Sequence, residues 1–402
     1  MGLLAVNAGS SSLKFALYTN LGMDDMAAPM LSGNIEGLEA QSARMSYRLA
    51  NGQLQVMQLE GQAGFSLFQT ALQALSDLVS NCLTGRPLLA VAHRVVHGGE
   101  WYRASVLVDE PVMARLQSLS ALAPLHQPHN LEGIRRFQAQ YPGVPQVACF
   151  DTAFHAHLPP EEYLFALPES IAQQGVRRYG FHGLSYQYLQ TQLRQRSQRA
   201  EQRVVMAHLG NGASLCAMKA GQSLATTMGF SALEGLMMGT RSGAIDPGVL
   251  LYLLDHGMSS QEITTLLYKH SGLLGVSGIA ADMRTLRASQ APKAQLAINM
   301  FTHRVVREIG AMTACLQGLD VLVFTGGIGE HDVQLRQDVC SQLGYLGVEI
   351  KTLQNAKATG SELMRIDATS SRVEVWVIPT DEGRMAAKSA WRLLQGRVDQ
   401  SS

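Results

Sequence analysis

The sequence predicts an α/β protein of two lobes built from a duplicated unit. At 402 residues the chain is too long for one ordinary hydrophobic core. Apolar residues make up 46% of it, and 38 glycines suit an α/β enzyme with many tight turns. Two segments of strand–glycine turn–strand type, residues 5–11 and 208–214, resemble each other. They predict one such turn in each lobe, both facing a shared cleft.

The first of these turns is bracketed by apolar runs. Gly9 has no side chain to block the approach of a ligand. The serines at 10–12 supply hydroxyl groups and Lys14 supplies an ammonium group, a combination that suits a phosphate. A serine-rich hairpin loop without a ligand is the alternative that the local sequence leaves open.

The remaining elements follow from apolar spacing and from turn residues. The Asn51-Gly52 pair between two strand-like runs is a strong hairpin signal. The first half further predicts helices over 65–82 and 112–122 and strands over 88–96 and 146–150. The second half predicts strands over 203–208, 213–219, 321–324 and 373–378, and helices over 248–256, 261–269, 294–317, 332–343 and 384–394. We expect the final helix to pack back on the first lobe.

Charge and cysteine usage exclude several classes of protein. Lys+Arg and Asp+Glu number 32 each, so no overall positive field favours nucleic acid. The five cysteines are scattered and form no C-x-x-C motif, which favours a reducing compartment and argues against a zinc knuckle. No signal-peptide pattern occurs, and no apolar run reaches the ~18 residues of a membrane span. We expect a cytoplasmic protein with no nucleic-acid or membrane partner.

Several polar residues follow apolar strands, where ligands bind in open α/β sheets. Arg94, between apolar residues, needs an anion, which can be a ligand or the partner in a structural ion pair. Arg241, on a glycine-flanked loop, is better placed for a ligand. Asp151 could bind Mg²⁺, accept a proton or cap a helix. His182 could be catalytic or structural.

Two histidine pairs, 126/129 and 155/157, raise a metal-dependent hydrolase as an alternative. Both pairs are predicted to lie in proline-rich loops, and no H-E-x-x-H occurs, so this alternative is the weaker one. Gly-Lys never occurs, which excludes an ordinary P-loop. The Gly326-Gly327-Ile328-Gly329 run is not followed by the Rossmann fingerprint. A bound nucleotide would therefore be held by several separate turns.

The motifs together resemble those of the acetate/propionate kinases, members of the actin–Hsp70–sugar-kinase fold group. Nine segments carry the resemblance in order along almost the whole chain. They are residues 7–14 (NAGSSSLK), 93–99 (HRVVHGG), 123–126 (APLH), 150–152 (FDT), 178–183 (RYGFHG), 208–212 (HLGNG), 233–243 (LEGLMMGTRSG), 324–330 (FTGGIGE) and 380–382 (TDE).

The resemblance implies two actin-like (ribonuclease H-like) lobes with a duplicated βββαβαβα core and an active-site cleft between them. The N-terminal lobe would cover 1–151 and be joined by a C-terminal helix over 384–402, and the nucleotide-binding lobe would cover 152–383. The implied reaction is reversible, direct in-line phosphoryl transfer between ATP and a short-chain carboxylate, giving ADP and an acyl phosphate. Mg²⁺, or Mn²⁺ in its place, would assist, and the chain would form a homodimer. A non-metabolic actin-like ATPase is the alternative within this fold group.

The resemblance also implies a role for each matched residue. Asp151, His182 and Arg241 would be catalytic, and Asn7 and Glu382 would hold the metal. The acid would be bound by Arg94, Val96, Leu125, His126, Phe181 and Ala232. The nucleotide would be bound by Ser10, Ser12, Lys14, His208, Leu209, Gly210, Asn211, Gly212, Asp282, Met283, Arg284, Gly327, Ile328, Gly329, Glu330 and His331.

Three positions refine these expectations. A carboxylic acid substrate is already ionised near pH 7, so we expect Asp151 to orient Mg²⁺ and substrate rather than to take up a proton. Ala232 stands where many members of the family have proline, which predicts a larger acyl pocket and propionate used at least as well as acetate. His331 replaces the asparagine usual in the family, so we expect no family role for its side chain.

Overall fold

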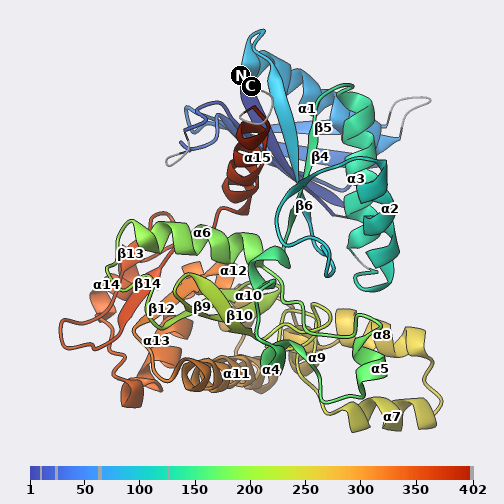
Figure 1. Ribbon diagram of the computed structural model, residues 1–402. Coiled ribbons are helices and arrows are strands. Elements are labelled where there is room, and N and C mark those ends of the chain that lie inside the picture. Colours follow the sequence, from blue (N-terminus) through green and yellow to red (C-terminus); the bar gives the residue numbers. More distant parts are fainter. Residues whose placement is uncertain (10, 23–25, 62–65, 125, 399–402) are drawn as a thin grey trace. The chain divides into compact units, whose positions relative to one another are not determined.

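The computed structural model describes residues 1–9, 11–22, 26–61, 66–124 and 126–398, and Figure 1 labels its elements. The chain divides into two compact units. Unit 1 comprises Met1–Ala153 and Asp381–Ser402, and unit 2 comprises Phe154–Thr380. Among the described residues, none of the helices combines the length and apolar character that crossing a bilayer requires.

Unit 1 is built on an eight-stranded sheet with the order β5-β4-β3-β2-β1-β6-β8-β7. Strands β1 to β5 form an antiparallel meander, while β1, β6 and β8 run parallel. The strands are β1 (Gly2–Ala8), β2 (Ser12–Tyr18), β3 (Leu31–Glu36), β4 (Ser42–Leu49), β5 (Leu54–Glu60), β6 (Leu88–Val95), β7 (Val106–Leu107) and β8 (Gln146–Phe150). The predicted hairpin at Asn51-Gly52 is confirmed by β4 and β5.

Helices bury the apolar side chains of this sheet. Helix α1 (Leu67–Leu83) places Leu72, Leu75 and Val79 in a core with β1 to β5. Helices α2 (Glu110–Ser118) and α3 (Gln127–Gln140) pack a second cluster against β6 and β8, and η1 (Leu119–Ala121) joins them. Helix α15 (Glu382–Val398) returns from the end of the chain to pack against β1 and β6, which confirms the prediction for the final helix (Figure 1).

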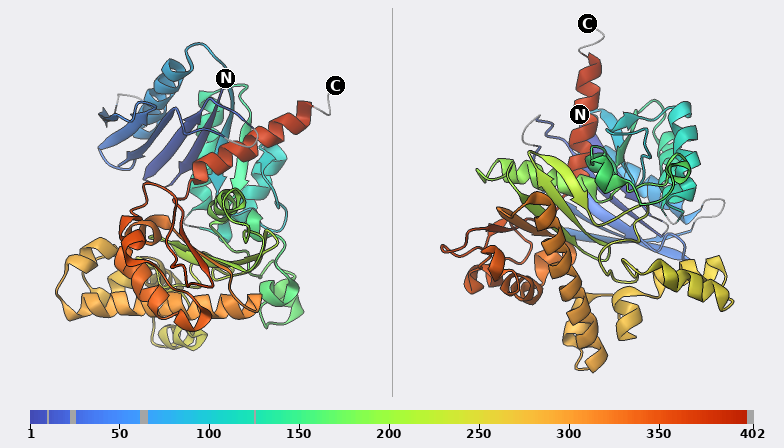
Figure 2. Two further views of the ribbon diagram at one scale, coloured as in Figure 1. Left: turned by 90° about the vertical axis from the view of Figure 1, so that its left-hand side faces the viewer. Right: turned by 60° about the horizontal axis from the view of Figure 1, so that its bottom comes forward.

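Unit 2 is built on a six-stranded sheet with the order β11-β10-β9-β12-β14-β13. Its strands are β9 (Val204–Leu209), β10 (Ala213–Lys219), β11 (Gln222–Thr226), β12 (Val321–Thr325), β13 (Met364–Arg365) and β14 (Glu374–Val377). Helix α6 (Gly183–Arg194) buries Tyr186, Leu189 and Leu193 against β9, β10 and β12. The 25-residue helix α11 (Pro292–Leu316) packs against β9, β10 and β11 (Figure 2).

Shorter helices complete both units. The turn η2 (Ala153–His155) follows β8. The rest of unit 2 contains α4 (Pro160–Tyr163), α5 (Glu169–Ala172), α7 (Pro247–Asp255), α8 (Ser260–Lys269), α9 (Gly272–Ser277), α10 (Met283–Ala288), α12 (Gly326–His331), α13 (Val333–Ser341), η3 (Gly344–Leu346) and α14 (Thr352–Lys357).

The two sheets confirm the predicted duplication. The run β3-β2-β1-β6-β8 in unit 1 has the same order and directions as β11-β10-β9-β12-β14 in unit 2. The alignment of the two turns, however, was predicted two residues out of register. The last pairs before the turns are Ala8 with Leu13 and Leu209 with Ala213, so Gly9 corresponds to Gly210 and not to Gly212.

One local prediction was wrong. The pair His126/His129 does not lie in a loop, because His126 is the N-cap residue of α3 and His129 lies in its first turn. A proline in that turn is compatible with a helix, since the first N–H groups of a helix have no intrahelical partner. The run Gly326-Gly327-Ile328-Gly329, for which no element was predicted, begins α12 directly after β12.

Candidate active site

In unit 1, Arg94 holds two carboxylates at the carboxyl end of the parallel strands. Its Nε and Nη2 donate to Asp151, with Nη2 2.7 Å from Oδ2, and its Nη1 lies 2.9 Å from Glu382 Oε2. Arg94 is the second-last residue of β6 and Asp151 follows the neighbouring β8, so the parallel register brings them together. Burial alone would lower the pKa of Arg94, but the two carboxylates outweigh it and raise that pKa. The sequence left open whether Arg94 binds an anionic ligand or forms a structural ion pair, and both remain open, because the same guanidinium can do either.

Glu382 is presented by the capped start of α15. The Asp381 Oδ1 atom accepts from the backbone N–H of Arg384 at 2.8 Å and from the hydroxyl of Tyr18 at 3.2 Å. A side-chain cap of this kind satisfies an N–H group that the helix leaves without a partner. The start of α15 is thereby fixed to β2, and Glu382 faces Arg94.

The turn between β1 and β2 carries the predicted phosphate and metal ligands of unit 1. Asn7 and Lys14 are direct cross-strand partners, and the Gly9 N–H donates to the carbonyl of Ser12 at 2.8 Å to close the turn. Paired residues on neighbouring strands have side chains on the same face, so Asn7 and Lys14 share one face of the hairpin. Ser12 is half-buried, while the predicted ligand Ser10 lies outside the described residues.

A residue that sequence reasoning missed fixes this edge of the sheet. Asn130, on α3, donates from Nδ2 to the carbonyl of Ala8 at 2.8 Å and accepts from the N–H of Val96 at 3.0 Å. It therefore joins the ends of β1 and β6, from which Asn7 and Arg94 project. The signal that could have found it is a polar residue on the buried face of a helix, but α3 itself was not predicted.

The oxygen donors of unit 1 suit Mg²⁺. Asn7 offers an amide oxygen, and Glu382 and Asp151 offer carboxylates. Within the described ranges, no three or more His, Cys, Asp and Glu side chains gather as a metal cage. Mg²⁺ is typically held by one or two carboxylates together with substrate phosphates and water, so this donor set fits the ion.

In unit 2, the turn between β9 and β10 lies among the predicted catalytic side chains. His182 Nε2 lies 3.5 Å, and Arg241 Nη1 3.7 Å, from the position that a Cβ atom of Gly212 would take. Arg241 also donates to the carbonyl of Ala232 at 2.9 Å. The side chain of Asn211 lies over Gly239, where a Cβ would meet its Oδ1 at 2.0 Å. The structure thus brings His182, Arg241 and the glycine turn together.

The second glycine segment lies beside this turn. Gly326 has a φ of +77°, and a Cβ there would meet the backbone of Leu209 at 2.7 Å, so glycine is required. The N atom of Gly327 lies 3.8 Å from where a Cβ of Gly210 would be. The turns of β9–β10 and β12–α12 are therefore neighbours, as a phosphate cradle built from separate segments requires.

Two predicted nucleotide ligands direct their side chains elsewhere. Glu330 is buried, and its Oε1 accepts from the N–H groups of Gly326 and Thr380 and from the hydroxyl of Thr325. It thus braces the glycine segment from behind. His331 bonds through Nδ1 with the carbonyl of Thr359, which gives this side chain a structural partner.

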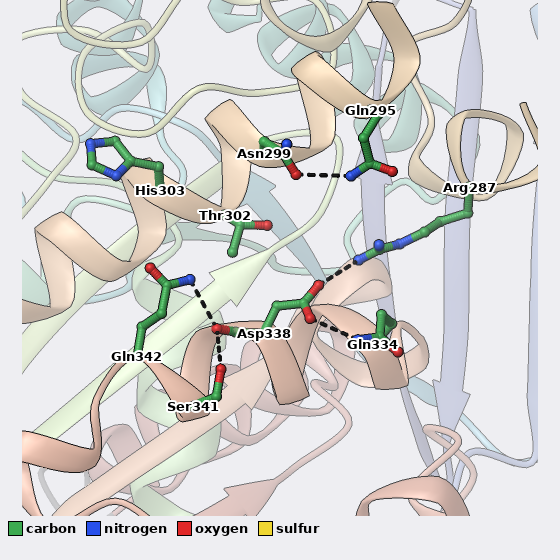
Figure 3. Close-up of a pocket in the computed structure, with 9 residues that line it drawn as sticks. All are labelled: Arg287, Gln295, Asn299, Thr302, His303, Gln334, Asp338, Ser341 and Gln342. Carbon is green, nitrogen blue, oxygen red and sulfur yellow. Dashed lines mark hydrogen bonds and ion pairs between the residues drawn. The ribbon is translucent and has the colours of Figure 1, made fainter. Parts of the chain in front are cut away.

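The segment predicted to lie near adenosine is linked to α13. Asp282 caps α10, accepting from the N–H of Thr285 at 2.9 Å, and Met283 is buried while Arg284 is exposed. One turn further, Arg287 Nε donates to Asp332 Oδ2 at 3.1 Å, and Asp332 Oδ1 caps α13. Arg287 also borders a polar pocket of about 560 Å³ between α11 and α13 (Figure 3). Its lining residues are Arg287, Gln295, Asn299, Thr302, His303, Gln334, Asp338, Ser341 and Gln342.

The predicted acid-binding residues are divided between the units. Val96 and His126 are half-buried in unit 1, and Leu125 lies outside the described residues. Phe181 is buried in unit 2, where its carbonyl bonds with Nε2 of the buried His155. Ala232 is half-buried in unit 2 and offers its carbonyl to Arg241.

Comparisons with known proteins agree with the motifs. The acetate kinase of Rhodopseudomonas palustris (strain ATCC BAA-98 / CGA009) is 47% identical over 404 residues, covering 98% of each chain. The crystal structure of Porphyromonas gingivalis acetate kinase is 36% identical with a TM-score of 0.87, covering 98% of this chain and 99% of that one. A propionate kinase from Francisella tularensis subsp. tularensis SCHU S4 is 36% identical with a TM-score of 0.88, covering 96% and 98%. These structures share the actin-like fold of the two units. Residues 2–388 match the acetokinase family, and the chain belongs to that family.

Proposed function

We propose that this protein transfers a phosphoryl group reversibly between ATP and a short-chain carboxylate, acetate or propionate, forming ADP and an acyl phosphate. The observation that carries the proposal is the match to the acetokinase family over residues 2–388. The geometry within each unit supports it, since one unit presents an arginine with carboxylates and the other presents glycine turns with a histidine and an arginine.

Arg94 is the proposed acid-binding residue. Glu382 already occupies one edge of its guanidinium, with Nη1 2.9 Å from a carboxylate oxygen, while Asp151 holds the other edge. The edge of the guanidinium that Glu382 occupies therefore binds a carboxylate, and a substrate acid carries the same carboxylate group as Glu382. An acid bound in place of Glu382 would leave that side chain, together with Asn7, for Mg²⁺. The ion, when bound, supplies positive charge to the phosphate oxygens.

His182, Arg241 and the glycine segments are the proposed phosphoryl-binding groups. In the reaction an ionised carboxylate oxygen attacks the γ-phosphorus as the bond to the β–γ bridging oxygen breaks, so no proton has to be moved. The charge spread over the equatorial oxygens needs donors already in position. His182 Nε2 and Arg241 Nη1 both lie beside Gly212 and suit that task. Lys14 and the N–H groups of the glycine segments are assigned to the remaining phosphates, and the Asp282–Arg284 stretch to adenosine.

A hydroxamate trapping assay tests the proposed function. Purified protein with MgATP and hydroxylamine should form acyl hydroxamate and ADP only when acetate or propionate is present. ADP formation without any dependence on a carboxylate would instead favour the actin-like ATPase. Arg241→Ala should abolish product, whereas Arg307→Ala, which removes an exposed arginine paired with Glu308, should not. Omission of Mg²⁺ should stop the reaction.

We further propose that the protein is a homodimer that uses α7. This nine-residue helix buries none of its side chains, and Val249, Leu251, Tyr252 and Leu254 are 38%, 63%, 60% and 46% exposed. Exposed apolar surface of this kind favours a second copy of the chain as its cover. Light scattering should give a dimer for the wild type and a monomer for Leu251→Lys. Leu353→Lys, at a 76% exposed site on α14, should stay dimeric.

A further inference from the structure

Two stacked histidines in unit 2 are each held by a buried serine. The rings of His182 and His208 lie 4.1 Å apart with an interplanar angle of 18°. Nδ1 of His182 is 2.9 Å from Ser214 Oγ, and Nδ1 of His208 is 2.9 Å from Ser185 Oγ. Both serines are fully buried. Because each serine bonds to Nδ1, the Nδ1 edge of each imidazole faces the buried interior.

The Ser214 hydroxyl is itself bound by a buried phenol. Tyr186, on α6, lies with its hydroxyl oxygen 2.5 Å from Ser214 Oγ and is fully buried. Burial raises the pKa of Tyr186 well above its ordinary value, so the phenol keeps its proton. Among the described residues, Ser214 Oγ is the hydrogen-bond partner of that hydroxyl. The phenol proton is therefore best placed when Tyr186 donates to Ser214.

The direction of the next bond follows from the proton of Ser214 itself. Ser214 Oγ has two lone pairs and could accept from Tyr186 and His182 together, but its own buried proton would then have no acceptor among the described residues. Ser214 therefore accepts from Tyr186 and donates to Nδ1 of His182. A neutral imidazole that accepts at Nδ1 carries its proton at Nε2. In the opposite direction Ser214 would accept from His182 and donate to Tyr186, and the phenol proton would be left in a buried site without this acceptor, which is costly.

The other edge of His182 faces the glycine turn. Its Nε2 lies 3.5 Å from where a Cβ of Gly212 would be, beside Arg241 Nη1 at 3.7 Å. His182 also has a φ of 60°, an uncommon backbone conformation for a non-glycine residue, which projects the ring from the start of α6. A proton at Nε2 thus lies on the edge where the proposed phosphoryl group would be.

We propose that Ser214, held by Tyr186, is a positioning residue that keeps His182 in its Nε2–H tautomer, so that the imidazole donates a hydrogen bond to the transferring phosphoryl group. This inference rests on the proposed function for the identity of the acceptor. The tautomer itself is a property of the protein without nucleotide.

Imidazole ¹⁵N NMR at pH 8 tests the tautomer directly. The His182 signals, assigned by their loss in His182→Asn, should show a protonated Nε2 and an unprotonated Nδ1 in the wild type. Ser214→Ala should mix the two tautomers and lower kcat by about 10- to 100-fold, with the KM values for ATP and acid within about twofold. Ser214→Thr should restore both the spectrum and kcat. Tyr186→Phe keeps the buried ring, and should give a mixed spectrum without loss of folding.

Cys216→Ala is the matched control. Cys216 is fully buried two residues further along β10, on the same face as Ser214, and its Sγ contacts Ser223. It should leave the His182 spectrum and kcat unchanged. A wild-type His182 with its proton on Nδ1, or a Ser214→Ala protein with unchanged tautomer and kcat, would overturn the inference. Because the spectrum needs no nucleotide, a wild-type protein without kinase activity would refute the proposed function while the tautomer is still measured.

Discussion

Arg94 and Asp151 form a two-point ion pair, with Nε 3.0 Å from Oδ1 and Nη2 2.7 Å from Oδ2. The Asp151 side chain is only 2% exposed. Such a carboxylate fixes the plane of the guanidinium, because the two bonds are parallel. Asp151 therefore orients Arg94 in this structure, whereas the expectation from the sequence, that Asp151 orients Mg²⁺ and substrate, stays a prediction.

Asp151→Asn separates two roles for this carboxylate: the orientation of Mg²⁺ expected from the sequence and the orientation of Arg94 that the ion pair favours. If Asp151 acts through Arg94, the variant should weaken acid binding without changing the Mg²⁺ requirement. The amide keeps one acceptor oxygen but loses the charge, and a hydrogen bond to a charged group contributes about 1.5–3 kcal/mol. We expect kcat/KM for the acid to fall by about 10- to 100-fold, with the KM for ATP nearly unchanged. Kinetics at varied acid and Mg²⁺ concentrations measure both.

The control for this variant is Glu132→Gln. Glu132 forms an ion pair with Arg136 at 2.6 Å, but this pair is open to solvent, since the side chain of Glu132 is 49% exposed and that of Arg136 is 31% exposed. Exposed pairs contribute about 0–1 kcal/mol, so neither stability nor kinetics should change measurably. If Asp151→Asn instead raised the Mg²⁺ concentration needed for activity, Asp151 would be a metal ligand and the orienting role would be wrong.

The duplication could be predicted from the sequence because each copy carries its own strand–glycine turn–strand signal. The strands at 146–150 and 213–219 were predicted to the residue, since buried strands are short, continuous apolar runs. Helices α3 and α6 were missed. Their N-termini have no Ser, Thr, Asp or Asn cap, beginning after His126 and His182, so the usual start signal is absent.

The residues proposed to bind ligands came from motifs, but the residues that support them could not be found in this way. Asn130 and Ser214 act through contacts between elements far apart in the sequence, and only the tertiary structure shows these pairs. Glu330 is the reverse case. It lies in a motif that predicts a nucleotide ligand, which stays a prediction, while its carboxylate accepts from the backbone N–H groups of Gly326 and Thr380.

Gly212→Ala should lower activity and leave stability nearly unchanged. The nearest atoms to the added methyl group, His182 Nε2 and Arg241 Nη1, would be at ordinary van der Waals distances of 3.5 and 3.7 Å. The methyl group would nevertheless occupy the space in which these groups should meet a phosphoryl oxygen. We expect kcat to fall at least about tenfold, since one lost donor costs more than that in comparable sites.

Gly344→Ala is the control for this variant, because a Cβ there would have no atom within 4 Å. Thermal unfolding measures the stability of both alanine variants, and steady-state kinetics measure their kcat. Gly344→Ala should match the wild type in both measurements. A Gly212→Ala protein with full activity would show that the space beside His182 and Arg241 is not used.

Three buried histidines should make the protein less stable in acid. Burial lowers the pKa of His93, His97 and His155 to about 4 each, although the bond from His93 to Gln146 opposes this shift. In the unfolded chain these three imidazoles bind protons near pH 6.5, whereas in the folded chain they stay neutral down to about pH 4. The free energy of unfolding is therefore highest above pH 6.5 and falls as the pH drops toward 4. Each group contributes about 3 kcal/mol at most.

Urea unfolding at pH 7, 6 and 5 measures this dependence. His93→Phe removes one titrating group and places a ring beside Phe137, which His93 already contacts edge to face. Its absolute stability will be lower, because Gln146 loses a partner, but its stability should fall less steeply with acid. If the free energy of unfolding of His93→Phe fell with acid as steeply as that of the wild type, His93 would not be buried in its neutral form.

Ala232 should set the choice between acetate and propionate. Relative to the proline that many members of the family have at this position, alanine lacks ring atoms, so the space beside it is larger. One methylene in an apolar pocket changes discrimination by about 1–3 kcal/mol. We expect kcat/KM for propionate to equal or exceed that for acetate in the wild type.

Ala232→Pro should shift the ratio of these two kcat/KM values toward acetate by about tenfold or more. The substitution keeps the carbonyl that accepts from Arg241 at 2.9 Å, so kcat with acetate should be retained. Ala225→Gly, on β11, serves as a control for a small change at a buried alanine and should leave the ratio unaltered. A strong preference of the wild type for acetate, or a ratio that Ala232→Pro does not move, would mean that the acyl chain does not extend toward residue 232.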